Sequence, residues 1–237
     1  MARLIINVDQ VAALRSVRGG KSPDPVHAGV LAELAGVDGV TMHLRADQPS
    51  TQKRDLYLLR EVLHTHLNLM IAPSEEMVES ALKIAPGMVT LVKEISRENP
   101  TCRTLDLEAD HDQLLEIIPR LQTQDILVAL YVAPEIDTVK RAAKLKADYI
   151  ELSALAYSGA KSGAEETNEL GKLSSMASLA SKLLLGVSCG GGLDYRNIRP
   201  LVQIEQFEEF ILGQAIVSRA LFVGLDQAIR EILALMK

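Results

Sequence analysis

The feature of this sequence that most constrains its fold is a regular alternation of short apolar runs with amphipathic segments. Eight runs are almost continuously apolar, and we expect strands there, over residues 3–8, 39–44, 67–72, 88–93, 126–132, 149–154, 183–188 and 209–213. Continuous apolar runs of this length are typical of strands that are buried on both faces of a parallel sheet.

Each run is followed by a segment with the apolar spacing of a helix. We expect these helices over residues 24–36, 50–65, 74–87, 110–122, 133–147, 167–182, 195–204 and 218–237. The first of them has a capping Asp24, then Pro25, and ends at Gly36, the order of end signals that helices favour. Eight such pairs predict an α/β fold, a (β/α)8 TIM barrel that forms a single domain over residues 1–237. An open doubly wound sheet is the alternative.

Composition narrows the class of protein. The chain has 237 residues, of which 48% are hydrophobic, and its formal net charge is −6. The acidic balance argues against a nucleic-acid partner, since binding phosphate backbones needs clustered Lys and Arg. Two cysteines without metal-ligand spacing argue against a disulfide scaffold and a metal centre, and no motif indicates a cofactor. No stretch has the length of a membrane span and no signal peptide opens the chain, so we expect a cytoplasmic protein.

In a TIM barrel the active site lies at the C-terminal ends of the strands. The polar or glycine positions at those ends are Asn7, Asp9, Gln10, His43, Arg45, Lys93, Glu94, Glu151, Ser153, Ser188, Cys189, Gly213 and Gln214. These residues are the first candidates for a functional site.

Three consecutive glycines, Gly190, Gly191 and Gly192, follow the seventh predicted strand. Loops after strands 7 and 8 of TIM barrels commonly bind phosphate through backbone N–H groups and a helix N-terminus. With Gly213 and Gln214 after strand 8, the run predicts a site for inorganic phosphate or a phosphorylated substrate. The alternative is a tight turn that needs positive φ, for which one glycine would be sufficient.

His43 and Arg45 are two residues apart, so strand alternation directs both side chains to the same face. If that face is the barrel interior, the neighbouring cation favours a neutral imidazole, which is a competent general base. The alternative is a hydrogen-bonded core histidine. The other histidines, at positions 27, 64, 66 and 111, are expected on the surface.

Two further residues have open roles. Asp9 is either an acceptor for a substrate hydroxyl or a partner for Arg15 or Arg18. Cys189 precedes the glycine amides and a helix start, which would favour a nucleophilic thiolate. The alternative is a buried, unreactive cysteine, which is the commoner case.

Five segments together carry a family resemblance. They are NVDQVAALRSVRG (7–19), PDPVHAG (23–29), GVDGVTMHLRAD (36–47), GLDYRNI (192–198) and GQAIVSRA (213–220). In order and spacing they resemble the pyridoxine 5′-phosphate synthase family along essentially the whole chain. The resemblance implies a (β/α)8 barrel, typically a homo-octamer. It implies the condensation of 3-amino-2-oxopropyl phosphate with 1-deoxy-D-xylulose 5-phosphate, with loss of water and inorganic phosphate.

The resemblance also implies roles for individual residues. Asn7 and Arg18 match residues that hold the amino-ketone phosphate, Asp9 and Arg45 match residues that bind the pentulose and its phosphate, His43 matches a catalytic base, and Gly192 and Gly213 match the phosphate cradle.

The sequence departs from the family pattern in its proton-transfer groups. Family histidines are replaced at Gln10, Ser50, Gly191 and Gln214, and a family glutamate is replaced at Met70. Each general acid or base typically contributes about 10²–10⁴ in rate, and neither Met nor Gly transfers a proton. Glu94, Glu151 or Cys189 are the residues that could substitute.

Three hypotheses follow. The first is an enzyme of this family that acts on small phosphorylated ketones, with His43 as base. The second is a non-catalytic binding or regulatory relative, and the third is a structural subunit of a mixed oligomer.

Overall fold

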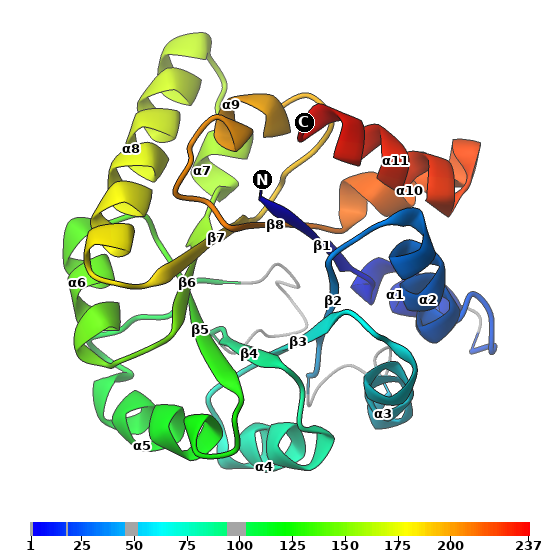
Figure 1. Ribbon diagram of the computed structural model, residues 1–237, viewed down its shortest axis with the longest axis horizontal. Coiled ribbons are helices and arrows are strands. Elements are labelled where there is room, and N and C mark those ends of the chain that lie inside the picture. Colours follow the sequence, from blue (N-terminus) through cyan, green and yellow to red (C-terminus); the bar gives the residue numbers. More distant parts are fainter. Residues whose placement is uncertain (1, 18, 46–51, 94–102) are drawn as a thin grey trace.

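The architecture is a closed barrel of eight parallel strands with helices on its outside (Figure 1). The computed structural model describes residues 2–17, 19–45, 52–93 and 103–237. Every strand pairs with its neighbours in chain order, and β8 closes the ring against β1, with Leu4 opposite Phe210. The predicted (β/α)8 barrel is therefore confirmed.

All eight apolar runs form strands. They are β1 (Arg3–Asn7), β2 (Gly39–His43), β3 (His66–Ile71), β4 (Met88–Leu91), β5 (Leu127–Val132), β6 (Tyr149–Ser153), β7 (Gly186–Gly190) and β8 (Glu209–Leu212). Only β7 is clearly displaced from the prediction. Leu183 ends the preceding helix by donating its N–H to Leu179, and Leu184 turns the chain with a φ of 63°. These apolar residues therefore form the turn and not the strand.

The helices match the predicted segments less closely than the strands do. The structure has α1 (Asp9–Val17), α2 (Pro25–Ala35), α3 (Lys53–Val62), α4 (Glu75–Ile84), α5 (His111–Gln122), α6 (Ile136–Lys144), α7 (Leu155–Ser158), α8 (Gly163–Lys182), α9 (Ile198–Val202), α10 (Gln214–Val223) and α11 (Leu225–Leu235). Helices α1 and α7 were not predicted. The single helix predicted over 218–237 is two helices, because Gly224 has a φ of 85° and interrupts the helical backbone.

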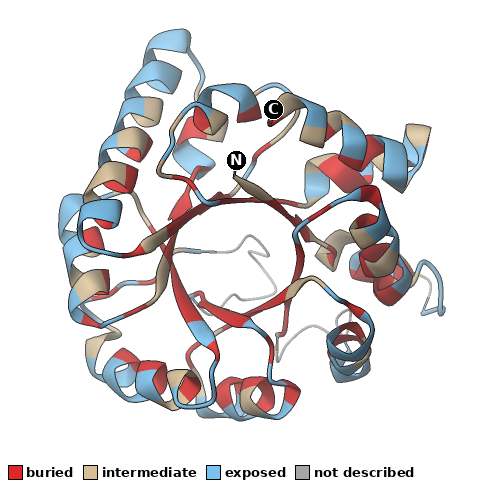
Figure 2. Ribbon diagram, viewed as in Figure 1, coloured by how far each residue is buried: buried red, intermediate tan, exposed pale blue. Residues whose placement is uncertain are grey.

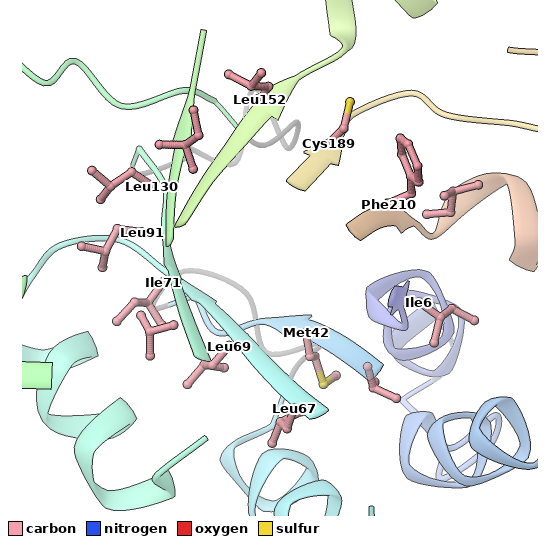
Figure 3. Close-up of a cluster of buried hydrophobic side chains, with 14 of the residues drawn as sticks. Ile6, Met42, Leu67, Leu69, Ile71, Leu91, Leu130, Leu152, Cys189 and Phe210 are labelled. Atoms are coloured by element: carbon pink, nitrogen blue, oxygen red, sulfur yellow. The ribbon is translucent and has the colours of Figure 1, made fainter. Parts of the chain in front are cut away.

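The main hydrophobic core lies between the outer face of the barrel and the surrounding helices. Figure 3 shows strand residues of this layer, such as Ile6, Met42, Leu69 and Phe210, and each of these four is fully buried. The buried ring of strands is visible in Figure 2. Because side chains alternate along each strand, the intervening positions face the barrel interior. At the C-terminal ends of the strands these inward side chains line the cavity described below.

The interior is more polar than the outer core. In its middle layer the Asn68 and Thr90 side chains exchange hydrogen bonds of 2.9 and 3.1 Å. At the N-terminal end lies His66, which was expected on the surface. It begins β3, and burial together with the nearby Arg3 cation lowers its pKa to about 4. This correction follows from the start of β3, one residue earlier than predicted.

No helix in the described ranges combines the length and apolarity needed to cross a membrane.

Candidate functional site

A cavity of about 720 Å³ lies at the C-terminal end of the barrel. Its lining includes the predicted residues Asn7, Asp9, Gln10, His43, Arg45, Gly191, Gly192, Gly213 and Gln214. The predicted Glu151 lines it too, together with Ala13, Met70, Tyr131, Leu193, Asp194, Ile211, Leu212, Ala215 and Ser218. Barrel closure thus brings together candidates from both ends of the sequence. Arg18, Ser50 and Glu94 lie outside the described residues.

Asp9 connects the first two strands at the cavity. Its carboxylate accepts the backbone N–H of His43 at 2.8 Å and the side-chain amide of Asn7 at 2.8 Å. Burial raises the pKa of Asp9 to about 6, although these hydrogen bonds and the Arg45 cation oppose the shift. Arg15 is not its partner, because Arg15 forms a buried ion pair with Asp55. Asp9 is therefore a titratable group facing the cavity.

His43 and Arg45 both line the cavity, as strand alternation predicts. His43 is the last residue of β2 and is 9% exposed. The hydrogen bond from its backbone to Asp9 holds the end of β2 against the start of α1. An imidazole in this position can exchange a proton with a ligand while remaining largely shielded from bulk water.

Glu151, on β6, is a buried carboxyl group in the cavity wall. Glu151 is 3% exposed. Burial raises the pKa of its carboxyl group to about 8, and the negative charge of Glu209 adds to this shift. At neutral pH the group is therefore mostly protonated and can donate a hydrogen bond or a proton.

The three glycines at the end of β7, of which Gly190 is its last residue, are each approached closely by a protein side chain. A Cβ atom at Gly190 would overlap the Glu151 carboxyl, and one at Gly192 would overlap the Ser158 hydroxyl. A Cβ at Gly191 would lie 3.0 Å from Tyr131 Oη and 3.1 Å from Leu155 Cγ.

The backbone gives a second reason for two of these glycines. Gly191 has a φ of 100° and Gly192 a φ of 71°, conformations that other residues rarely adopt. Packing and turn geometry therefore account for the whole run, more completely than the single-glycine turn that we considered. Phosphate binding by these amides stays a prediction.

The N-terminus of α10 also faces the cavity. Gly213, Gln214, Ala215 and Ser218 line it, and no side chain caps the helix at Gly213. Exposed first-turn N–H groups of this kind favour anions. The side-chain oxygen of Gln10, Oε1, lies close to Gly213. It is buried and has no hydrogen-bond partner in the described structure.

Cys189 lies on the opposite face of β7, outside the cavity. Figure 3 shows it in the outer core near Leu152 and Phe210, and it is fully buried. Burial, with a contribution from Glu151, raises the pKa of its thiol well above its usual value. The nucleophile considered from the sequence is corrected here, since a buried, protonated thiol is unreactive.

The positions that depart from the family pattern are also in the wall. Gln10, Met70, Gly191 and Gln214 all line the cavity. Met70 packs with Val92 and Tyr131 in a small apolar cluster of its own. Sequence reasoning did not single out Tyr131. The available signal was its place near the end of β5, where alternation leaves a side chain facing inward.

Fold and site together define a class: a TIM-barrel enzyme whose cavity holds titratable groups at the C-terminal ends of the strands. Residues 4–237 match the family model described as pyridoxal phosphate biosynthesis protein PdxJ. The chain belongs to this family.

Two related sequences align with all or nearly all of the chain. It is 45% identical over 237 residues to the pyridoxine 5′-phosphate synthase of Geobacter metallireducens, covering 100% of this chain and 99% of the relative. It is 41% identical over 232 residues to that of Synechocystis, covering 98% and 96%.

Solved structures show the same fold at low identity. The phosphoribosyl anthranilate isomerase from Thermococcus kodakaraensis has a TM-score of 0.64 at 12% identity, covering 100% of this chain and 99% of that one. KGPDC from Streptococcus mutans has a TM-score of 0.69 at 12% identity, covering 99% and 97%.

Proposed function

We propose that this protein is a pyridoxine 5′-phosphate synthase-like enzyme of vitamin B6 (pyridoxal phosphate) biosynthesis. Its reaction is the condensation of 3-amino-2-oxopropyl phosphate with 1-deoxy-D-xylulose 5-phosphate, or the conversion of a similar phosphorylated ketone. We further propose that it works in the cytoplasm as a homo-oligomer and binds inorganic phosphate, which the family reaction releases.

One observation carries the proposal. Every described residue to which the resemblance assigns a substrate role lines the same cavity: Asn7, Asp9, His43, Arg45, Gly192 and Gly213. These residues come from β1, the start of α1, the end of β2, the loop after β7 and the residue after β8. Barrel closure places these segments together, and the resemblance assigns related roles to all of them, which supports one shared substrate site.

The proposed chemistry uses groups with different proton affinities. Phosphate would bind between Arg45 and the N-terminus of α10, where positive charge and backbone N–H groups face the cavity. His43 would take a proton from the carbon next to the carbonyl group. Glu151, protonated near neutral pH, would hydrogen-bond to the oxygen on which negative charge develops.

The departures make this reaction slow. Met70 and Gly191 cannot transfer protons, and the space above Gly191 is taken by Tyr131 and Leu155. We expect turnover of the two family substrates to be at least about 10²-fold slower than in a relative with all the family histidines and the glutamate.

A cavity that keeps the binding residues but has lost proton-transfer groups at Met70 and Gly191 also favours a second candidate, a binding or regulatory protein without turnover. Purified protein should be incubated with each phosphorylated ketone alone and with both, and binding and pyridoxine 5′-phosphate formation measured separately. Binding with slow product formation supports the enzyme. Binding without product supports the second candidate, and absence of binding refutes both.

A further inference from the structure

A second buried carboxyl group lies in the barrel interior, on the N-terminal side of the cavity. Glu151 of β6 and Glu209 of β8 are 3% and 1% exposed. Their neighbours Leu152 and Phe210 face the outer core (Figure 3), so strand alternation directs both glutamates into the barrel. The proposed chemistry uses Glu151 and leaves the role of Glu209 open.

The strand register places these two carboxyl groups near each other. Glu151 is opposite Ser188 of β7, and Ser188 is opposite Glu209. Neighbouring strands are about 4.8 Å apart, so the two glutamate Cα atoms are about 10 Å apart across β7. The residue between them at this level is a small serine, whose hydroxyl donates to the Ile150 carbonyl at 3.3 Å. A charge on one glutamate therefore acts on the other with little screening by water.

Arg3 of β1 is the cation beside Glu209. Its Nη2 atom lies 2.8 Å from Glu209 Oε1. The contact is an ion pair and not an aligned hydrogen bond, because this oxygen has no hydrogen-bond partner in the part of the chain that the structure describes. Burial raises the pKa of Glu209; the Arg3 cation opposes this shift, and the charges of Glu208 and Asp38 add to it. Arg3 therefore stabilises the ionised form of Glu209.

Other ionisable groups among the described residues face the interior or the cavity. They are His43 after the middle of β2, His66 at the start of β3, Tyr131 on β5, Tyr149 on β6, and Asp9, Arg45 and Asp194 in the segments that follow β1, β2 and β7. His66 is neutral at pH 7, since its pKa is about 4. Burial is the main cause of the raised pKa of Glu151, and the charge that adds to it is that of Glu209.

We propose that Arg3 and Glu209 are positioning residues for the proton on Glu151. Arg3 holds Glu209 ionised, and the buried negative charge of Glu209, together with burial, keeps the proton on Glu151 at the wall of the cavity. An ion pair at the N-terminal end of the barrel thereby sets the protonation state of a group that acts at the C-terminal end. The consequence for turnover rests on the proposed function, in which Glu151 donates a hydrogen bond to the substrate oxygen.

Infrared spectroscopy measures this proton directly. The C=O stretching band of protonated Glu151 is the band that Glu151→Gln removes, and its loss is followed from about pH 5 to about pH 10. In Glu209→Gln the midpoint should move about one pH unit toward acid, as expected for the loss of a unit charge about 10 Å away in a protein interior. Glu208→Gln is the matched control and should leave the midpoint unchanged, because the Glu208 side chain is 47% exposed and lies 3.8 Å from Arg3.

Variants of Arg3 test the other half of the proposal. In Arg3→Gln the carboxyl group of Glu209 loses its cation, so a second buried carboxylic acid band should be present at neutral pH, and adding Glu209→Gln should remove it. Arg3→Lys keeps the charge and should restore the single band. In the assay of pyridoxine 5′-phosphate formation, the alkaline limb of the pH profile should move toward acid in Glu209→Gln. A merely structural role would lower the rate equally at every pH.

The two levels of the argument fail differently. An unchanged Glu151 midpoint in Glu209→Gln, or a single acid band in Arg3→Gln, would overturn the inference while the proposed function stands. If circular dichroism shows that Glu209→Gln is unfolded, the bands of Arg3→Gln and Arg3→Lys decide alone. If the midpoint moves as expected but the unmodified protein forms no product, the proton assignment stands and the proposed function fails.

Discussion

The buried ion pair between α1 and α3 should be a large determinant of stability. Arg15 donates two hydrogen bonds to Asp55, at 2.9 and 2.6 Å, and the side chains are 6% and 0% exposed. Asp55 also accepts a hydrogen bond from the backbone N–H of Gln52 at 3.1 Å, which caps the N-terminus of α3. Because α1 begins with Asp9 and Gln10, the pair also holds one wall of the cavity.

Arg15→Met leaves Asp55 as a buried charge without its buried cation, although the exposed Arg54 lies 3.5 Å from Asp55 Oδ1. Removing one partner of such a pair typically costs about 3–5 kcal/mol in the free energy of unfolding. For a chain of 237 residues the unfolding entropy corresponds to about 0.5 kcal/mol per degree, so Tm should fall by about 6–10 °C. The double variant Arg15→Met with Asp55→Leu should recover part of this loss, since an apolar pair is often as stable as the ion pair it replaces, although it removes the acceptor of the Gln52 N–H at the start of α3.

Urea unfolding and calorimetry of the unmodified protein, both single variants and the double variant form a double-mutant cycle. The reasoning would be refuted by a loss below about 1 kcal/mol in Arg15→Met, which is the range of a solvent-exposed pair. A double variant that is less stable than both single variants would also refute the reasoning.

Three further predictions concern the cavity and its reaction. Because the pKa of Glu151 is raised to about 8 in the folded state, folding keeps a proton that the unfolded chain loses near pH 4.5; stability should therefore fall as pH rises through this window, by up to about 1.4 kcal/mol per pH unit. Between pH 5.5 and pH 8.5 the free energy of unfolding, measured with urea, should fall less in Glu151→Gln than in the unmodified protein. An equal fall in both proteins would show that Glu151 does not have the raised pKa. Gly192→Ala should lower Tm because of its positive φ and the overlap with Ser158. Adding Ser158→Ala should recover only the part due to the hydroxyl, because the Cβ atom of residue 158 would remain 2.8 Å from the new Cβ; full recovery of Tm would show that neither the positive φ nor this remaining contact contributes. The family condensation, assayed by pyridoxine 5′-phosphate formation, should run at least about 10²-fold below a relative with the complete set of family residues, and a rate within a few-fold of that relative would reveal proton donors that we have not identified.

The strands were the most predictable part of the fold. Each is a local apolar run, and its burial on both faces is recorded directly in consecutive residues. The same local rule correctly directed His43 and Arg45 to one face, because side chains alternate along any strand.

Helix boundaries were less predictable. Asp9 and Gln10 were interpreted as the end of a strand, but they form the first turn of α1. The sequence after them, VAALRSV, is compatible with a helix, yet its proximity to the first apolar run obscured it. Gly224 divides the last helix, which an isolated glycine in a helical pattern permits without requiring it.

The candidate site could be predicted as a list of residues but not as an environment. Barrel closure places the C-terminal ends of all strands together, so Asn7 and Gln214 could be assigned to one cavity from chain order alone. The state of each group depends on burial. Nothing near Glu151 in the sequence indicates a pKa of about 8, because its cause is the surrounding barrel and Glu209, 58 positions away.

Amino-acid order alone determined the repeated strand–helix unit, the resulting barrel, and the side of it on which polar residues gather, because these depend on local periodicity and on the number of units. Tertiary structure decided which faces meet. It placed Cys189 in the outer core, put Tyr131 and Leu155 next to Gly191, and packed Met70 with Val92 and Tyr131. These contacts join residues far apart in the chain, and their energies arise only when packing excludes water from both partners.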